Sequence, residues 1–251
     1  MKLISLNTWG GEAGVELLLD FFATHGDVDV FALQEVWNGG EHMLGEKSAG
    51  SWLSRRRPTL LKEIREVLPG YVDLYHPHFY DFFGLATFVK KDLKVVEEGE
   101  LYIYKEKGFL SEKDFGDHAR ILHFMTLDTE KGPRTVIQLH GLWNGKGKGD
   151  SEDRLEQSDR IVKFVSDLKN PFVIVGDFNL RPDTESVKKL ESIGLRNLIT
   201  EYGITSTRTS HYTKEEKFAD YAFVSDGIEV KDFKVLPDEV SDHSPLYLDF
   251  V

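Results

Sequence analysis

Apolar segments rich in β-branched and aromatic residues recur along the whole chain, separated by polar stretches that contain glycine, proline, aspartate or asparagine. Such segments are typical of β-strands. They predict strands at residues 2–9, 28–36, 84–91, 93–104, 119–128, 134–143, 171–180, 218–226 and 244–251. Four other segments have the apolar spacing of amphipathic helices. They predict helices at residues 12–26, 51–70, 151–170 and 182–194.

The order of these elements indicates the fold class. Several strands, such as those between Gly84 and Tyr104, are joined by connections too short to hold a helix, whereas other strands flank helices. This mixture predicts an α/β protein with a largely antiparallel or mixed sheet rather than a doubly wound parallel one. Since the sequence has no internal repeat, low-complexity tract or Pro/Ser-rich linker, we expect a single domain over residues 1–251.

Composition limits the chemistry. A length of 251 residues with 40% hydrophobic residues is sufficient for a substantial core. The chain has no cysteine, which excludes disulfides, thiolate metal sites and thiol nucleophiles, so any metal must be held by oxygen or imidazole. The lack of a signal peptide, membrane span or glycosylation sequon favours a cytoplasmic protein, with a mature secreted chain as the alternative. We expect a monomer.

The charge balance is acidic. Asp and Glu number 43 against 31 Lys and Arg, which gives a formal net charge of -12. This charge opposes tight binding of a nucleic-acid backbone by the whole surface. A local basic patch or bound divalent cations would have to offset it, so any nucleic acid is expected to bind weakly and transiently.

The strand prediction at residues 171–180 ends in side chains that can do chemistry. In "VIVGDFNLRP" Asp177 and Asn179 are two residues apart, so in an extended chain they point to the same side. A carboxylate can orient or deprotonate water, and a neutral amide can bind a phosphoryl oxygen. The alternative is an ordinary turn that leads into a helix cap.

Similar polar endings occur on other predicted strands. They are Asn7, Gln34, Glu35, His140, Asp220, Asp242 and His243. Buried ionised groups are costly unless they are paired or bound to a metal, so this repetition predicts one shared polar site. Asn, Glu and Asp are hard oxygen donors that suit magnesium or manganese, whereas a structural zinc site would need Cys or closely spaced His pairs. A hard metal with several acids and two histidines indicates phosphoryl chemistry.

The six blocks "LISLNTW", "ALQEVW", "VIQLHG", "VIVGDFNLRPD", "FADYAFVS" and "VSDHSPL" resemble, in this order and over nearly the whole chain, the endonuclease/exonuclease/phosphatase superfamily. This superfamily includes DNase I-like nucleases, abasic-site endonucleases, inositol polyphosphate phosphatases, neutral sphingomyelinases and deadenylase-type enzymes. The resemblance implies a four-layer α/β/β/α sandwich: two mixed, mostly antiparallel sheets packed face to face with helices outside. It places the site where the strand ends converge.

The resemblance also implies roles for the polar strand ends. Asn7, Glu35 and Asp242 match the residues of the family's magnesium (or manganese) site, with Glu35 as a direct ligand. Asp177 matches the residue that orients or activates the attacking water. Asn179 matches the amide that contacts the scissile phosphate.

The remaining matches concern the phosphate and the substrate. His243 matches the family's histidine near the phosphate, with Asp220 as its orienting carboxylate, and His140 matches a second histidine of the nuclease and phosphatase branches. Arg120 and Asn144 match substrate-contacting positions more loosely.

Two basic segments keep alternative interpretations. Arg55, Arg56 and Arg57 form the one dense basic run, which either contacts a polyanionic substrate or is a solvated helix face. The glycine-rich stretch 144–151 lacks the spacing of a phosphate-binding P-loop but could shape substrate entry.

The sequence therefore predicts a metal-dependent phosphodiesterase that uses in-line attack by water, with a nuclease as the preferred activity. The alternative is a phosphomonoesterase or a lipid head-group hydrolase of inositol phosphate or sphingomyelin type. It ranks second because a polyphosphate pocket needs clustered Lys and Arg, which the sequence does not show away from the two basic segments. A non-catalytic metal-binding module ranks third, because every block keeps its reactive residue.

Overall fold

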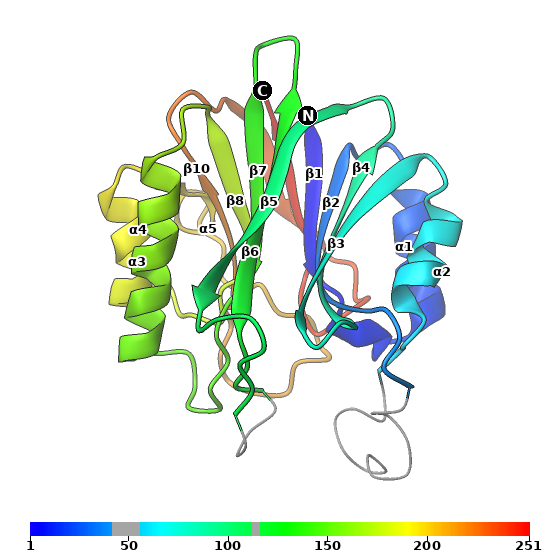
Figure 1. The fold of residues 1–251 in the computed structure, drawn as a ribbon, viewed down its shortest axis with the longest axis horizontal. Helices are drawn as coiled ribbons and strands as arrows, with labels where there is room; N and C mark the ends of the chain where they lie inside the picture. The colour runs from blue at the N-terminus through cyan, green and yellow to red at the C-terminus, as the bar shows by residue number, and fades with distance from the viewer. Residues whose placement is uncertain (42–55, 112–115) are drawn as a thin grey trace.

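Two six-stranded β-sheets packed face to face form the centre of the protein (Figure 1). The computed structural model describes residues 1–41, 56–111 and 116–251. The first sheet has the strand order β11 (Val230–Val235), β12 (Leu246–Phe250), β1 (Lys2–Asn7), β2 (Val30–Trp37), β4 (Phe83–Lys90) and β3 (Tyr71–Phe79). The second has the order β5 (Lys94–Tyr104), β6 (Arg120–Asp128), β7 (Arg134–His140), β8 (Phe172–Asp177), β10 (Asp220–Val224) and β9 (Arg196–Asn197).

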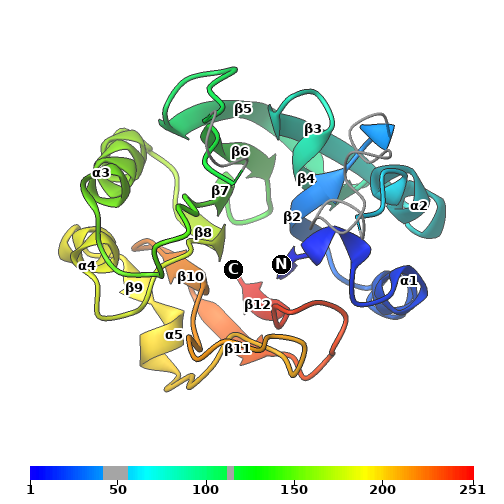
Figure 2. The same ribbon diagram turned by 90° about the horizontal axis from the view of Figure 1, so that it is seen from below.

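Helices cover the outer faces of the two sheets, as the views from the side and from below show (Figures 1 and 2). The first sheet carries α1 (Val15–Thr24) and α2 (Leu60–Val67), and a 3-10 turn, η1 (Trp9–Gly11), follows β1. The second sheet carries α3 (Glu152–Ser166) and α4 (Glu185–Ser192), while the short α5 (Leu198–Glu201) lies beside β10. The predicted four-layer α/β/β/α sandwich is confirmed.

One parallel strand pair lies inside each sheet. β1 is parallel to β2 and β7 is parallel to β8, whereas the other paired strands are antiparallel. Both sheets are therefore mixed and mostly antiparallel, as expected. Parallel neighbours end at the same edge of a sheet, so Asn7 lies beside Gln34 and His140 lies beside Asp177.

The alternation along β1 decides which way its polar end points. Ile4 and Leu6 pack in the core beneath α1 and α2, whereas Leu3 belongs to the core that the second sheet shares. Since successive strand residues point to opposite faces, Asn7 follows Leu3 toward the second sheet. The side-chain amide of Asn7, at the end of β1, therefore points toward the end of β8.

The structure adds elements that the apolar pattern did not predict. β3 and β11 were missed because their faces are largely half-buried or exposed, so they lack a continuous apolar run. β3 is an edge strand, which is where a proline such as Pro77 is tolerated. Of the predicted helix at 51–70, the described part is helical over Leu60–Val67, and residues 51–55 lie outside the described residues.

The contact between β7 and β8 leads to a first prediction. Gly176 has φ 136°, and a Cβ added to it would lie 2.1 Å from the carbonyl oxygen of Leu139, its partner on β7. Gly176→Ala should therefore lower the free energy of unfolding by about 3 kcal/mol, through backbone strain and overpacking. Urea denaturation measures this change as a lower midpoint.

Gly70→Ala is the matched control, because Gly70 has no positive φ and a Cβ there would meet nothing within 4 Å. Its free energy of unfolding should stay within about 0.5 kcal/mol of that of the parent protein. Equal midpoints for both variants would contradict the tight approach of β8 to β7.

Candidate active site

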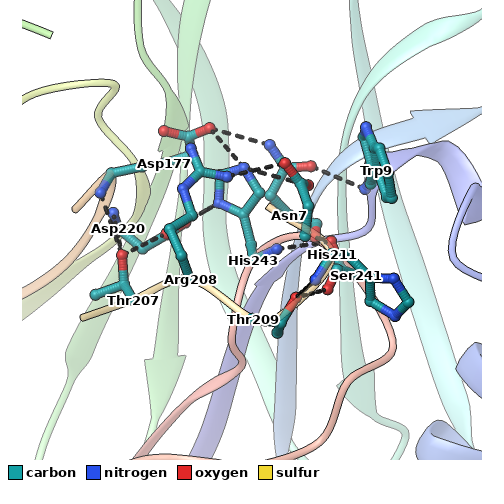
Figure 3. Close-up of polar contacts among 12 residues, drawn as sticks. Asn7, Trp9, Asp177, Thr207, Arg208, Thr209, His211, Asp220, Ser241 and His243 are labelled. Atoms are coloured by element: carbon teal, nitrogen blue, oxygen red, sulfur yellow. Dashed lines mark hydrogen bonds and ion pairs between the residues drawn. The ribbon is translucent and has the colours of Figure 1, made fainter. Parts of the chain in front are cut away.

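The ends of β1, β2 and β8 meet at the edge of the sandwich that Figure 2 shows from below. The side-chain amide of Asn7 donates to Asp177 Oδ2 at 3.0 Å (Figure 3). The same amide donates to Glu35 Oε1 at 3.2 Å. Its oxygen accepts the backbone N–H of Trp9 at 2.9 Å. One amide thus links a carboxylate of the first sheet to a carboxylate of the second.

Two polar residues of this edge hold left-handed backbone conformations. Glu35 has φ 57° and Asn179 has φ 55°. The register of β2 against β4 shifts between Leu33 and Val36, which is where Glu35 leaves the regular pleat. Non-glycine residues with such φ values cost about 1 to 3 kcal/mol each and cluster at functional sites.

His243 is held in place by Asp220. The ring Nδ1–H of His243 donates to Asp220 at 2.8 Å, and Thr207 donates its hydroxyl to the same carboxylate at 2.9 Å. This pairing fixes the tautomer, so His243 Nε2 faces Asp177 Oδ2 at 3.6 Å and Asp242 Oδ1 at 3.7 Å. Burial and the nearby Arg208 disfavour the charged ring, but these three carboxylates together raise the pKa of His243 above its ordinary value.

Asp177 lies at the centre of the cluster. Its Oδ1 accepts the backbone N–H of Asn179 at 2.8 Å, and its Oδ2 lies 3.7 Å from His140 Nε2. Burial alone would raise the pKa of this carboxyl, but the positive charges of His243 and Lys148, with others, hold it below its ordinary value. Asp177 is therefore an ionised carboxylate in a buried position.

His140 has the opposite electrostatic character from His243. The ring is 3% exposed, and burial together with the nearby Arg120 lowers the pKa of His140 well below its ordinary value. It is thus a neutral imidazole, which can donate a hydrogen bond without carrying a charge.

The oxygen-rich side of the cluster fits a divalent cation. Among the described residues, Asp177, Asp220 and His243 bring their ligand atoms within 4.8 Å of one another. Both oxygens of Asp220 already bond His243 or Thr207, so Asp220 acts as the orienting carboxylate. In contrast, Asp242 Oδ1 is buried without a hydrogen-bond partner, so this oxygen can coordinate a cation.

A cavity of about 390 Å³ opens over these residues. Its walls are aromatic, formed by Trp9, Phe83, Trp143 and Tyr212. Cationic side chains also line it: Arg56, Arg120, Lys148, Arg208 and Lys214. The cavity thus joins the carboxylate cluster to a local positive field on a chain whose net charge is -12.

The sequence matches the model of the Endonuclease/Exonuclease/phosphatase family over residues 4–243. The chain belongs to the endonuclease/exonuclease/phosphatase family. It is a phosphoester hydrolase of this family, with a buried Asp/His cluster that can hold a metal. A search of curated proteins found no significant match.

Solved structures of the endonuclease/exonuclease/phosphatase family and related proteins have the same fold. A mannosyl-6-phosphatase from Bacteroides thetaiotaomicron superposes with a TM-score of 0.72 at 20% identity, covering 100% of this chain and 99% of that one. A conserved protein of unknown function from Enterococcus faecalis gives 0.74 at 19%, covering 100% and 99%. The catalytic domain of human nocturnin, solved with a bound sulfate, gives 0.65 at 18%, covering 100% and 93%.

In this family member the fold brings most of the predicted site residues to one place. Asn7 bonds both Glu35 and Asp177. His243 lies 3.6 Å from Asp177 and 3.7 Å from Asp242. The individual roles stay predictions. Arg120 is 2% exposed and lines the cavity, and burial lowers its pKa to about 10.

Asn144 is placed differently from the expectation. Its side-chain oxygen accepts the backbone N–H of Lys146 at 3.1 Å, which ties it into its own loop, and it does not belong to the described residues that line the cavity. Of the basic run, Arg56 lines the cavity and lies 3.7 Å from Glu35, whereas Arg57 pairs with Glu63 on α2. Arg55 lies outside the described residues.

Three cationic residues of the cavity, Lys148, Arg208 and Lys214, were not among the predicted site residues. Lys148 comes from the glycine-rich loop and is 1% exposed, and burial, partly offset by Asp177, lowers its pKa to about 8. Arg208 donates to Asp242 Oδ2 at 3.1 Å and stacks over Tyr212, with its guanidinium 4.0 Å from the ring centroid. The lysines of the glycine-rich loop could have indicated Lys148, whereas no sequence motif indicates Arg208.

The pair of His243 and Asp220 leads to a second prediction. His243→Gln should lower kcat by about 10²–10³-fold, because it removes a preorganised donor. Asp220→Asn should lower kcat by about 10–100-fold, because it releases the ring. The double variant should be no slower than His243→Gln alone, since Asp220 acts through the ring.

Steady-state kinetics of the parent, the two single variants and the double variant measure the coupling between His243 and Asp220. Asp226→Asn, an exposed carboxylate just beyond the other end of β10, is the control and should keep the parent rate. If the reduction of kcat in the double variant equals the product of the two single reductions, the positioning role of Asp220 is contradicted.

Proposed function

We propose that the protein is a divalent-metal-dependent hydrolase of small phosphate esters, with phosphomonoesters as the preferred substrates. The observation that carries this proposal is the bounded cavity with cationic side chains above the carboxylate cluster. Its volume of about 390 Å³ lies in the range of small-molecule sites.

The charge of the cavity favours a monoester over a diester. A terminal phosphate carries about -1.5 to -2 charges near neutral pH, more than the single charge of a diester, so it needs more cationic partners. The sequence ranked the diester first because no clustered Lys and Arg were evident. The fold assembles such a cluster from separate segments, with Lys148 and Arg208 beside Asp177 and Asp242.

Each polar side chain of the site then has a role. Asp177, ionised and buried, orients the attacking water and accepts its proton. His140, Asn179 and His243 donate to the nonbridging phosphoryl oxygens, where negative charge develops during in-line attack. A divalent cation held by Glu35, Asp242 and Asn7 would supply charge neutralisation at the phosphoryl group or the leaving oxygen.

The nuclease preferred from the sequence is the second candidate. The aromatic walls Trp9, Trp143 and Tyr212 favour it, because partly exposed rings can stack on nucleobases. The overall charge of -12 weighs against a long polyanion, since the backbone outside the cavity would face repulsion.

A substrate panel tests the proposal. The panel contains an aryl monophosphate, a bis-aryl phosphate, sugar phosphates, inositol phosphates, supercoiled plasmid, short single strands and sphingomyelin, each with Mg²⁺ or Mn²⁺. We expect kcat/KM for the best monoester to exceed that for the bis-aryl diester by at least about tenfold, or about 1.4 kcal/mol. A faster reaction with plasmid or single strands would overturn the monoester preference and support the nuclease.

A further inference from the structure

A second cluster of metal-ligating side chains lies away from the active site. His76 on β3, Glu98 on β5 and His123 on β6 bring their ligand atoms within 4.8 Å of one another. His76 Nε2 lies 3.1 Å and His123 Nε2 lies 3.4 Å from the same oxygen of Glu98. None of these three is among the described residues that line the active-site cavity.

The cluster joins the edges of the two sheets. β3 is the last strand of the first sheet and β5 is the edge strand of the second, and they lie side by side in both views (Figures 1 and 2). The imidazole rings of His76 and His123 stack with centroids 4.2 Å apart. Side chains from both sheets therefore meet around one carboxylate.

His123 has an unused ligand atom. The ring is 1% exposed, its Nδ1 bonds the Thr87 hydroxyl at 2.8 Å, and its Nε2 is buried without a hydrogen-bond partner. Burial and the nearby His76 lower the pKa of His123 to about 3, so the ring is neutral at physiological pH. A neutral imidazole with a free ring nitrogen is the form that binds metals.

The other nitrogen of each ring is already oriented. His76 Nδ1 bonds Glu100 at 2.8 Å, and the Thr87 hydroxyl that holds His123 also accepts a hydrogen bond from Gln138 at 2.7 Å. Histidine ligands of metals almost always have their second nitrogen fixed in this way. The partners Glu100 and Thr87 thus leave both Nε2 atoms directed at Glu98.

Protonation of His76 is an alternative explanation for the contacts of this ring with Glu98 and Glu100. A charged His76 between Glu98 and Glu100 would form two ion pairs and need no metal. That arrangement leaves the buried His123 Nε2 without a hydrogen-bond partner, which is costly. A cation at Glu98 instead engages all three groups at once.

We propose that His76 Nε2, His123 Nε2 and a Glu98 oxygen form a binding site for a divalent cation of the Zn²⁺ class. Two imidazoles and one carboxylate suit zinc better than magnesium, and three protein ligands leave a fourth position for water. Water can reach that position, because the Glu98 side chain is 43% exposed. The bound ion ties β3 to β5 and stabilises the contact between the sheets.

Zinc binding in the presence of excess Mg²⁺ tests this site, since Mg²⁺ competes for the oxygen ligands of the proposed active site. We expect equilibrium dialysis with metal analysis to find one Zn²⁺ per chain, and Zn²⁺ at about 100 times its Kd to raise Tm by roughly 5 to 10 °C. Glu98→Gln and His76→Asn, both at partly exposed positions, should weaken Zn²⁺ binding at least tenfold. Glu97→Gln, the exposed neighbour on β5, is the matched control and should bind like the parent.

The proposal is overturned if the parent binds no Zn²⁺, or if Glu98→Gln and His76→Asn bind Zn²⁺ as the parent does, because the ion then lies elsewhere. Near-parental hydrolysis of the best substrate by Glu98→Gln verifies that the variant is folded and that its loss of zinc is confined to this site.

Discussion

Removal of divalent metal is expected to lower the rate of phosphoester hydrolysis by at least about 10³-fold, because a bound cation contributes several kcal/mol of charge stabilisation. Without it, Glu35, Asp177 and Asp242 present negative charge to an anionic substrate. Asp242 Oδ1, which is buried without a hydrogen-bond partner, is the structural sign of this dependence. Initial rates after dialysis against a chelator measure the effect.

Addition of Mg²⁺ or Mn²⁺ in excess of the chelator should restore the rate, whereas K⁺ at equal ionic strength should not. The Glu98→Gln variant separates the two metal sites, since it should show the same loss and the same recovery as the parent. Activity that survives complete chelation would contradict the metal-dependent mechanism.

Replacement of Asp177 is expected to have the second large effect. Asp177→Asn keeps the size of the side chain and an oxygen for the Asn179 N–H, but it removes the charge that orients and deprotonates water. General-base catalysis contributes about 10²–10⁴-fold, so kcat should fall by about 10³-fold. KM should change less, because the cationic residues that bind phosphate remain.

Asp183→Asn is the matched control, since Asp183 is an exposed carboxylate a few residues beyond the same strand. It should keep the parent kcat within about twofold, because it lies outside the cavity. An Asp177→Asn protein that retains more than about a tenth of the parent kcat would remove Asp177 from the chemical step.

The strand ends of the site could be predicted from the sequence because each follows a run of apolar residues. Asp177 follows an apolar run, and a buried carboxylate at such a position needs partners. The same reasoning identified Asn7 and His140, each at the last residue of its strand. A polar residue at the end of an apolar run thus contains the information for these positions.

The cationic part of the cavity could not be predicted in the same way. Lys148 and Arg208 come from irregular segments, where no period relates a residue to its direction. Lys148 is 1% exposed although lysine is rarely buried, and the reason is the negative charge of strands that are distant in sequence. Such a position depends on tertiary structure alone.

The same limit applies to His76 and His123. The sequence argued against a zinc site because it lacks closely spaced histidine pairs, yet β3 and β6 bring two distant histidines into stacking contact. β3 itself was not predicted, because its half-buried residues alternate too weakly to mark a strand. Ligand spacing along a chain identifies local sites and misses those built between strands.

The hydrogen bond from Asn7 on β1 to Asp177 on β8 crosses from one sheet to the other. Neither sheet alone contains a complete set of catalytic groups, so hydrolysis requires both halves to be docked in one relative position. Enzymatic activity therefore reports whether the two sheets are packed in their native relative position. As denaturant is added, the activity should be lost before the β-strands unfold. The difference between the two midpoints would measure the stability of the packing between the sheets.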